Sequence, residues 1–570
     1  MEDDLHKNFK AKMSVKKACL AGVFSWVLVL VLVLCTVPVT EADYTAAVVE
    51  YKAISWLLPF INEEQAHAII ELNLDAFNYL ASEAASKGAD ILVFPEYGIT
   101  GFVEEERDYV VPFLETVEEP SFHKSKGCIP CHEKFSTQTL IQYRLSCIAL
   151  KHNITIVANL MTVQPCDNQT DPHCPPDGRY QYNTDVAFSN EGELVAKYHK
   201  ENLYTGEAKV FNPGHNQTEV AAFKTSFGYF GLFTCFDLLF PYPAERLVGK
   251  LGVDTMVFPT AWMNQLPLLS AAEYQQSWSL SYGVNLLAAN QHYPIAQMTG
   301  SGIFSPTTGA VDYTYDMKSF LGRMLVARVK STGQRSASGR FADLENYSQS
   351  KHSKVQGMTS AGIDGGINSG LLSGIQRDST DAHFKENQLS ATQNQSSASS
   401  FDESMESVRQ VPKYFIAQMN DDPYNLTVLQ GTKGRVSVSN KNISCTLDYV
   451  RESDSEMYAL GAFDGLHTMN GDYYVQCCGL IRCKSNTDPY QCGAEMSDAA
   501  TIFQEFELRM EGQSDQTRLF PEVLTSGVRL PQVGKEWGYS EKMHQIWSRG
   551  GTLMEPLLAA NIFGRWYQND

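Results

Sequence analysis

The sequence has few basic residues for its length. Lysine and arginine number 45 against 65 aspartates and glutamates in 570 residues, which leaves a net charge of −20. Binding to DNA or RNA needs clusters of basic side chains, and the sequence offers none. It also contains no internal repeat, and its end, LAANIFGRWYQND, carries no apolar tail. We therefore expect no nucleic-acid partner and no lipid anchor at the C-terminus.

The length predicts more than one domain, because 570 residues exceed what one hydrophobic core usually supports. A composition of 43% hydrophobic and 11% aromatic residues is typical of globular proteins. Residues 333–411 differ, since they are rich in serine, glutamine and glycine and poor in aromatic residues. Such a segment cannot bury enough apolar surface to fold. We predict a domain at 43–332, a disordered linker at 333–411 and a second domain at 412–570.

The N-terminus has the layout of a secretory signal. Lys16 and Lys17 precede a long apolar run that ends near Val39 in small and polar residues. We predict a signal region at 1–42 and a secreted, extracellular protein. The run approaches the roughly 20 residues that span a bilayer, so the alternative is a protein tethered by an uncleaved signal anchor.

N-x-S/T sequons fit lumenal or extracellular surface loops and support the secretory route. Seven are present as candidate glycosylation sites, at Asn153, Asn168, Asn216, Asn346, Asn394, Asn425 and Asn442.

Cysteine count is informative in a secreted chain, because disulfides persist outside the cytosol. Thirteen cysteines are present, of which Cys19 and Cys35 lie in the predicted signal region. The remaining eleven are an odd number, so at least one stays unpaired within the monomer. Ten of them form two groups of five on either side of Cys235. Because Cys235 alone ends an apolar run, we predict that it is the free thiol.

Helix-like and strand-like patterns alternate through the first 300 residues. Apolar side chains at helical spacing predict a helix over 64–87, and a short apolar run predicts a buried strand over 90–96. This alternation indicates an α/β domain with helices layered on sheets. Further strands are expected at 154–160, 184–189, 193–199, 229–234 and 255–260, with 184–199 forming a hairpin, and helices at 244–250 and 268–283. Beyond the linker, alternating stretches such as 435–439, 471–483 and 501–510 predict a smaller β-rich domain with its own disulfides.

Three polar residues fall at the ends of predicted strands: Glu96 in FPEYGITG, Lys200 in KYHKENLYTGE and Cys235 in FTCFD. Side chains at strand ends can meet in one cleft although they are distant in sequence. Each residue alone has an ordinary alternative. Glu96 could cap a helix or end a solvated strand, Lys200 could lie on the surface, and Cys235 could be a buried small side chain.

The contexts of these residues resemble the three signatures of the carbon–nitrogen hydrolase (nitrilase) superfamily, whose members carry a Glu-Lys-Cys triad. The stretches HCPPDGRYQYNTDVAFS (173–189), FPTAWMNQLPLLSA (258–271), MTGSGIFSP (298–306) and YALGAFDGLHT (458–468) resemble the biotinidase and vanin (pantetheinase) family. The resemblance runs from about Tyr44 to Asp570, apart from the linker. It implies a nitrilase-like α-β-β-α sandwich followed by a smaller β-rich C-terminal domain.

The resemblance also implies roles for the triad. Cys235 would be the nucleophile, Glu96 the proton acceptor, and Lys200 the proton donor and oxyanion stabiliser, together with the backbone N–H of Phe236. The product of the first step would be a thioester on Cys235. Glu207 is the candidate for a further glutamate that steadies the lysine. No metal or cofactor is implied.

Two features depart from the family pattern. Residue 97 is tyrosine where aspartate is expected, which predicts an altered cleft shape without an effect on the triad. A long insert from about Ser348 to Gln410 separates the two domains. Neither feature removes a catalytic group.

Other chemistries fit the sequence less well. A papain-like protease would need a histidine base and a C-G-x-C-W context, which Cys235 lacks. The cluster 477-CCGLIRCKSNTDPYQC-492 could be a zinc site, but an oxidising compartment favours disulfides. His467 and His292 are expected to serve packing or hydrogen bonding, with lining of the cleft as the alternative for His292.

The expected substrate is a small, vitamin-derived linear amide, either biocytin or pantetheine. The tailless C-terminus, Gly98 and the run NQLPLL at 264–269 favour the biotinidase-like branch, and hence biocytin. A hypothesis of another class is a catalytically silent secreted binding protein, which the intact triad disfavours.

Overall fold

A computed structural model describes residues 43–55, 61–102, 106–120, 129–214, 221–332 and 413–570. The predicted signal region, the predicted linker, Cys128 and three of the sequons (Asn216, Asn346 and Asn394) lie outside these ranges. The described residues up to 332 and from 414 onwards belong to one compact unit.

The first domain contains two six-stranded mixed sheets. In the first, the strand order is β12-β1-β2-β3-β4-β5, with β1, β2 and β3 parallel and β3, β4 and β5 antiparallel. In the second, the order is β11-β10-β9-β8-β7-β6, with β7, β8 and β9 parallel. The strands are β1 (Asp43–Glu50), β2 (Ile91–Val93), β3 (Thr155–Pro165), β4 (Arg179–Phe188), β5 (Leu194–His199), β6 (Ala222–Lys224), β7 (Tyr229–Leu232), β8 (Thr255–Thr260), β9 (Asn285–Asn290), β10 (Ser301–Ser305), β11 (Gly309–Thr314) and β12 (Arg323–Lys330).

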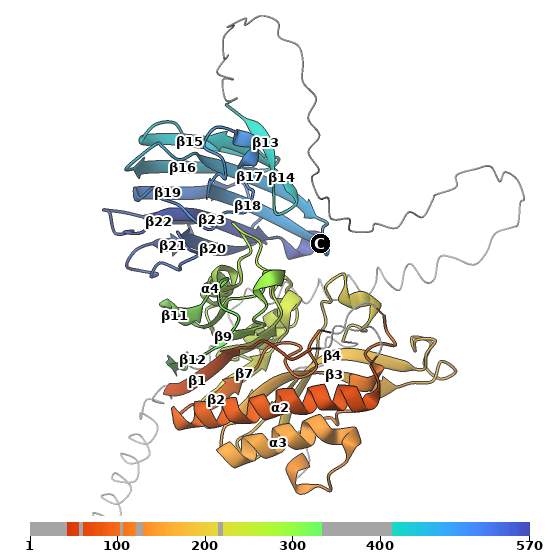
Figure 1. Ribbon diagram of the computed structural model, residues 1–570. Coiled ribbons are helices and arrows are strands. Elements are labelled where there is room, and N and C mark those ends of the chain that lie inside the picture. Colours follow the sequence, from red (N-terminus) through yellow and green to blue (C-terminus); the bar gives the residue numbers. More distant parts are fainter. Residues whose placement is uncertain (1–42, 56–60, 103–105, 121–128, 215–220, 333–412) are drawn as a thin grey trace, which may run out of the picture. The chain divides into compact units, whose positions relative to one another are not determined.

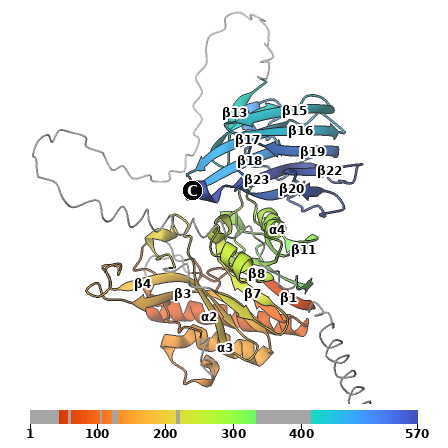
Figure 2. The same cartoon turned by 180° about the vertical axis from the view of Figure 1, so that it is seen from behind.

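Helices cover the outer faces of the two sheets. Figure 1 shows α2 (Glu63–Ser86) and α3 (Leu140–His152) side by side along the first sheet. Figure 2 shows α4 (Ala271–Tyr282) close to the strands of the second sheet. Successive side chains of a strand point to opposite faces. In β1, Val48 therefore packs in the core between the sheets, while Val49 packs in the core beneath α2 and α3. This is the predicted α-β-β-α sandwich.

The second domain is a sandwich of two antiparallel sheets. Their strand orders are β13-β14-β17-β18-β23-β20 and β15-β16-β19-β22-β21, and the domain is the β-rich one that was predicted. Its strands are β13 (Phe415–Met419), β14 (Asp422–Val428), β15 (Lys433–Asn440), β16 (Ile443–Arg451), β17 (Tyr458–His467), β18 (Tyr473–Arg482), β19 (Phe503–Glu511), β20 (Arg518–Thr525), β21 (Gly538–Ser540), β22 (Gln545–Ser548) and β23 (Leu557–Arg565).

Most of the predicted elements of the first domain are present. The helix predicted at 64–87 is α2, and the predicted hairpin is the antiparallel pair of β4 and β5. The helix predicted at 244–250 is a single π-helical segment, Glu245–Lys250. The strand predicted at 90–96 is shorter, since β2 ends at Val93. Helix α3 and strands β1, β6, β10, β11 and β12 were not anticipated.

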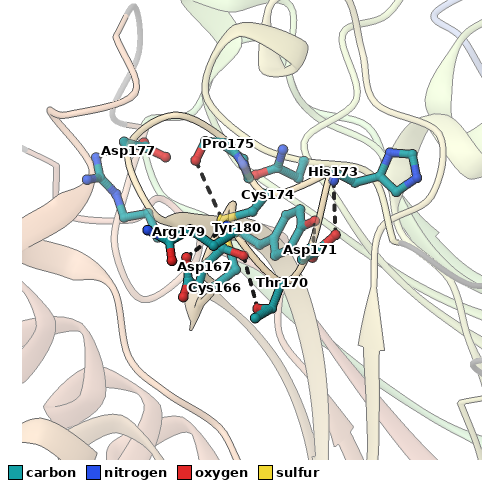
Figure 3. The surroundings of a disulfide bond; sticks show 12 residues. Cys166, Asp167, Thr170, Asp171, His173, Cys174, Pro175, Asp177, Arg179 and Tyr180 are labelled. Atoms are coloured by element: carbon teal, nitrogen blue, oxygen red, sulfur yellow. Dashed lines mark hydrogen bonds and ion pairs between the residues drawn. A yellow bond between two sulfur atoms is a disulfide. The ribbon is translucent and has the colours of Figure 1, made fainter.

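Four disulfides are present in the described residues: Cys131–Cys147, Cys166–Cys174, Cys445–Cys478 and Cys483–Cys492. Figure 3 shows the second of them, with Tyr180 and Asp171 beside it. Cys235 is free, as predicted. The prediction that disulfides account for the cluster at 477–492 is wrong for Cys477, which is also free and buried. Neighbouring residues of a strand face opposite sides, so on β18 only Cys478 points towards Cys445 in the other sheet.

Four sequons lie within the described residues. Asn153, Asn168 and Asn442 are exposed, and Asn425 is half-buried. Their glycosylation stays a prediction. Within the part of the chain that is described, no helix combines the length and apolarity needed to span a membrane.

Candidate active site

The structure brings the three predicted catalytic residues to one cavity. Glu96 follows β2, Lys200 follows β5 and Cys235 follows β7, and all three line a cavity of about 580 Å³. Lys200 Nζ lies 2.8 Å from Glu96 Oε1, and both side chains are 1% exposed. The ends of three strands from two sheets thus supply a carboxylate, an ammonium group and a thiol to the same space.

Glu96 has one oxygen engaged and one unpartnered. Its Oε1 accepts hydrogen bonds from Lys200 and, at 2.7 Å, from Asn183 Nδ2. Its Oε2 is buried and has no hydrogen-bond partner among the described residues. Burial raises the pKa of Glu96 above its usual value, although the charge of Lys200 opposes this. The side chain is therefore suited to accept a proton at Oε2.

Lys200 lies between two carboxylates. Besides Glu96, it contacts Glu207 Oε2 at 2.6 Å. Burial alone would lower the pKa of Lys200, but the charges of Glu207 and Glu96 outweigh it and hold the pKa well above its usual value. Lys200 therefore keeps its positive charge and its donor hydrogens in a buried place.

Glu207 reaches Lys200 from the first turn of a short 3₁₀ helix, Glu207–Lys209. Its Oε2 also accepts the backbone N–H of Tyr204 at 3.0 Å, and its Oε1 accepts from Asn183 Nδ2 at 2.9 Å. Burial would raise the pKa of Glu207, but the charge and hydrogen bond of Lys200 hold it below its usual value. The structure thus brings together the pair that the resemblance suggested, with Glu207 ionised beside Lys200.

A hydrogen-bonded turn presents Cys235. Asp237 Oδ2 accepts the backbone N–H of Thr234 at 3.0 Å and the hydroxyl of Tyr198 at 2.8 Å, while the Thr234 hydroxyl donates to Asp185 at 2.7 Å. Between these anchors, Cys235 has a φ of +47°, a left-handed conformation that such a residue keeps only when its surroundings fix it.

Cys235 opens a 3₁₀ helix, Cys235–Leu239, in which Phe236 is the second residue. The first N–H groups of a helix have no acceptor within it, so the position of Phe236 suits donation to a bound oxygen.

The thiol of Cys235 is protonated in the resting protein. Burial raises its pKa above the usual value, and the carboxylate of Glu96 raises it further, while Lys200 opposes both. A thiol in this state needs a nearby base before it can act as a nucleophile.

His292 is not among the residues that line the cavity, so the structure does not support the alternative of a cleft-lining role. Its side chain is 1% exposed, and Nδ1 lies 2.7 Å from Glu50 Oε1. Its other ring nitrogen lies 3.0 Å from the backbone carbonyl oxygen of Ser319. Glu50 also accepts from the hydroxyl of Thr299 at 2.6 Å. The ring therefore serves the hydrogen-bonding role that was the expected one.

Tyr97 lines the cavity and so affects its shape, as expected. It does more than that, because its hydroxyl donates to Glu207 Oε1. This contact does not contradict the expectation that the tyrosine leaves the triad untouched, because Glu207 is not a member of the triad.

Several residues of the site were not anticipated. Asn183 contacts both Glu96 and Glu207, and Asp237 fixes the turn that carries Cys235. A signal existed for Asn183, because Asn183, Thr184 and Asp185 form a polar run inside strand β4, where all three are buried. Buried polar side chains are normally hydrogen-bonded, which marks such a run for attention.

The rest of the cavity is mostly apolar. From the first domain it is lined by Phe102, Val210, Phe211, Leu239, Ala261, Trp262, Met263, Leu269 and Met298, with Gln265 as a polar group. The C-terminal domain contributes His467, Met469, Asn470 and Tyr473. A Cβ on Gly471 would lie 2.7 Å from Phe236 Cζ, so the loop between β17 and β18 approaches Phe236 this closely only with glycine. The C-terminal domain therefore completes the cavity.

Comparisons with known proteins show which families and structures this chain resembles. Residues 64–292 match the family model "Carbon-nitrogen hydrolase", and residues 413–570 match "Vanin C-terminal domain". Human pantetheinase is 38% identical, in an alignment covering 93% of this chain and 90% of that protein. Human biotinidase is 36% identical over 93% of this chain and 90% of that protein. Among solved structures, an amidase from Nesterenkonia sp. aligns at 20% identity and a TM-score of 0.37, covering 54% of this chain and 97% of that one.

Proposed function

Because this chain belongs to the vanin and biotinidase family of carbon–nitrogen hydrolases, which act on amides, we propose that it hydrolyses biocytin through a thioester on Cys235. The observation that carries the proposal is the buried Glu96–Lys200–Glu207 group, which shares one cavity with a free, protonated thiol.

The reaction begins with transfer of the Cys235 proton to the unpartnered Oε2 of Glu96. The sulfur then attacks the amide carbonyl carbon, and the charge that develops on the carbonyl oxygen is stabilised by Lys200 and the backbone N–H of Phe236. The tetrahedral intermediate collapses, the C–N bond breaks, and the amine leaves with the proton that Glu96 held. The acyl group stays on Cys235 as a thioester.

Water completes the cycle. Glu96 takes a proton from water, the resulting hydroxide attacks the thioester carbon, and the C–S bond breaks. The Cys235 sulfur recovers its proton, and the carboxylic acid, biotin in the case of biocytin, is released. Glu207 takes no proton in this scheme, because Lys200 holds it ionised.

The choice of biocytin rests on the run NQLPLL, whose Gln265 and Leu269 line the cavity. Gly98 does not support this choice, because a Cβ there would lie 2.9 Å from the carbonyl oxygen of Pro95. This glycine therefore serves the turn after β2. Pantetheine is the second candidate substrate, and it is supported by the 38% identity to human pantetheinase.

A paired assay tests the proposal. The full chain, purified from the medium of cultured eukaryotic cells, is offered biocytin and pantetheine separately, with Cys235→Ala as the matched control. We expect release of biotin and lysine by the wild type and none by the variant. Hydrolysis of pantetheine alone would reverse the choice of substrate, and turnover of neither amide would support the silent binding protein.

Secretion is part of the same proposal, and the four disulfides support it. An intact mass of the protein recovered from the medium tests it. A chain that begins near residue 43 is expected, whereas a chain that retains the leader and stays with the cells would indicate a signal anchor.

A further inference from the structure

Tyr97 directly follows Glu96 and has a backbone conformation that few tyrosines adopt. Its φ is +57°, in the left-handed region where bulky side chains are uncommon. The conformation is held by a hydrogen bond of 2.9 Å from its N–H to Asn159 Oδ1 and by packing of its ring, 5.5 Å from that of Phe102. Residues that surrounding contacts hold in such conformations concentrate at functional sites.

The hydroxyl of Tyr97 joins the group around Lys200. It donates to Glu207 Oε1, and it accepts from Asn183 Nδ2 at 3.0 Å. The same amide group of Asn183 lies 2.7 Å from Glu96 Oε1. The phenol therefore contacts Glu207 directly, and it is linked to Glu96 through the side-chain amide of Asn183. Both carboxylates contact Lys200.

The groups that face the Glu207 carboxylate come from several segments of the first domain. They are Tyr97 and Glu96 after β2, Asn183 on β4, Lys200 after β5, the N–H of Tyr204, and Cys235 after β7. Of these, Lys200 is the cation and Glu96 the competing carboxylate. The state of Glu207 is thus set by one positive charge, one negative charge and a small number of donors.

We propose that Tyr97 is a positioning residue, which keeps Glu207 ionised and aimed at Lys200 by donating a hydrogen bond to Glu207 Oε1. With Oε1 occupied by Tyr97 and Asn183, Oε2 faces Lys200 at 2.6 Å. A hydrogen bond to a charged acceptor is stronger than one between neutral groups. Proton transfer then falls to Glu96, whose Oε2 has no hydrogen-bond partner within the described part of the chain. This inference rests on the proposed roles of Glu96, Lys200 and Cys235.

The phenol is suited to this role because it stays protonated. Burial raises the pKa of Tyr97 well above its usual value, and the charges of Glu207 and Glu96 raise it further. The family resemblance predicts aspartate at residue 97, and an ionised aspartate cannot donate a hydrogen bond. The contact is therefore a property of tyrosine at residue 97.

The test is Tyr97→Phe, which keeps the ring and removes only the hydroxyl. Loss of the donor raises the pKa of Glu207, so this carboxylate takes up a proton at a higher pH than in the wild type. We expect the acid limb of the kcat/KM profile to move up by about one pH unit, so that kcat/KM at a given pH on that limb falls about tenfold, since one pKa unit is a tenfold change. At neutral pH, where Glu207 stays ionised, the loss should be smaller. KM should change less than twofold.

Tyr180→Phe is the matched control. The Tyr180 hydroxyl also donates to a carboxylate, Asp171 Oδ2 at 2.7 Å, but beside the Cys166–Cys174 disulfide (Figure 3). Tyr180 is not among the residues that line the cavity. This variant should keep the wild-type pH profile. Thermal unfolding of both variants shows whether they are folded.

Two further results decide the matter. In a Glu207→Gln background, Tyr97→Phe should have little additional effect, because the charged acceptor is already gone. An unchanged acid limb in Tyr97→Phe, or a change in KM alone, would overturn the inference and leave Tyr97 as a wall residue. Because the profiles are measured with biocytin or pantetheine, failure of the wild type on both would instead overturn the proposed function.

Discussion

The two free thiols of the described chain, Cys235 and Cys477, resemble each other in isolation and differ in their surroundings. Both are unpaired, and burial raises the pKa of each above its usual value. Cys235 follows β7, lines the cavity and is affected by the positive charge of Lys200. Cys477 lies within β18, is fully buried opposite Phe463 and Phe563, and is affected by carboxylates and no cation.

The comparison shows that a shifted pKa does not identify a nucleophile. Both thiols are protonated at neutral pH, so neither is reactive on its own. What Cys235 has in addition is a base with a free oxygen, a cation able to stabilise an oxyanion, and space for a substrate. Cys477 instead has apolar neighbours and a hydrogen bond with the side chain of Tyr424. The predictions below test whether these differences decide reactivity.

The largest expected effect comes from removing one thiol or the other. Cys235→Ala should lower kcat/KM by about 10⁴-fold or more, because no other group can form the thioester. Cys477→Ala should stay within about twofold of the wild type. Both variants are assayed on biocytin and pantetheine after near-ultraviolet circular dichroism has established that they are folded. Substantial turnover by Cys235→Ala would contradict the view that Cys235, and not Cys477, is the nucleophile.

A smaller effect is expected from removing the cation that distinguishes Cys235. Lys200→Met keeps the length of the side chain and should lower kcat/KM by about 10²- to 10³-fold, in line with loss of an oxyanion donor. Lys197→Met is the control, since Lys197 is also buried on β5 but contacts the Val117 carbonyl at 3.2 Å outside the cavity. Equal losses of kcat/KM in the two variants would mean that any buried lysine of β5 or its end is needed, and that the position of Lys200 in the cavity is not what matters.

The smallest effect concerns stability. Cys477→Ala truncates a side chain in the core and should lower the free energy of unfolding by about 1–2 kcal/mol, as small core truncations do. Cys235→Ala should lower the free energy of unfolding less, because Cys235 is only partly buried and lines the cavity. Urea unfolding without reductant, which keeps the disulfides intact, measures both. The reverse order would contradict the view that Cys477 serves only packing.

The positions of Glu96, Lys200 and Cys235 near strand ends could be predicted from local patterns, whereas their roles as a triad came from the resemblance of their contexts to the family signatures. Parallel neighbouring strands bring their C-terminal ends to one edge of a sheet, so Glu96 after β2 and Cys235 after β7 were expected at such edges. Local patterns also give the helix over Glu63–Ser86 and the β4–β5 hairpin. In these cases the information lies within a short stretch of chain.

The remaining features depend on contacts between distant segments. Tyr473 lines the cavity although it lies 238 positions after Cys235 in the sequence, and no local pattern reports such a contact. The pairing of His292 with Glu50 likewise joins residues 242 positions apart. A free cysteine in the C-terminal group could have been predicted, because the five cysteines after Cys235 are an odd number and cannot all pair with each other.

Alkylation of the folded protein tests the central claim most directly. The full chain is treated with iodoacetamide in the presence and absence of saturating substrate, and labelled peptides are counted by mass spectrometry alongside the remaining turnover. The account predicts a label on Cys235, a loss of turnover in proportion to it, protection by substrate, and no label on Cys477 until urea is added. Complete labelling of Cys235 with turnover intact would contradict its role as the nucleophile.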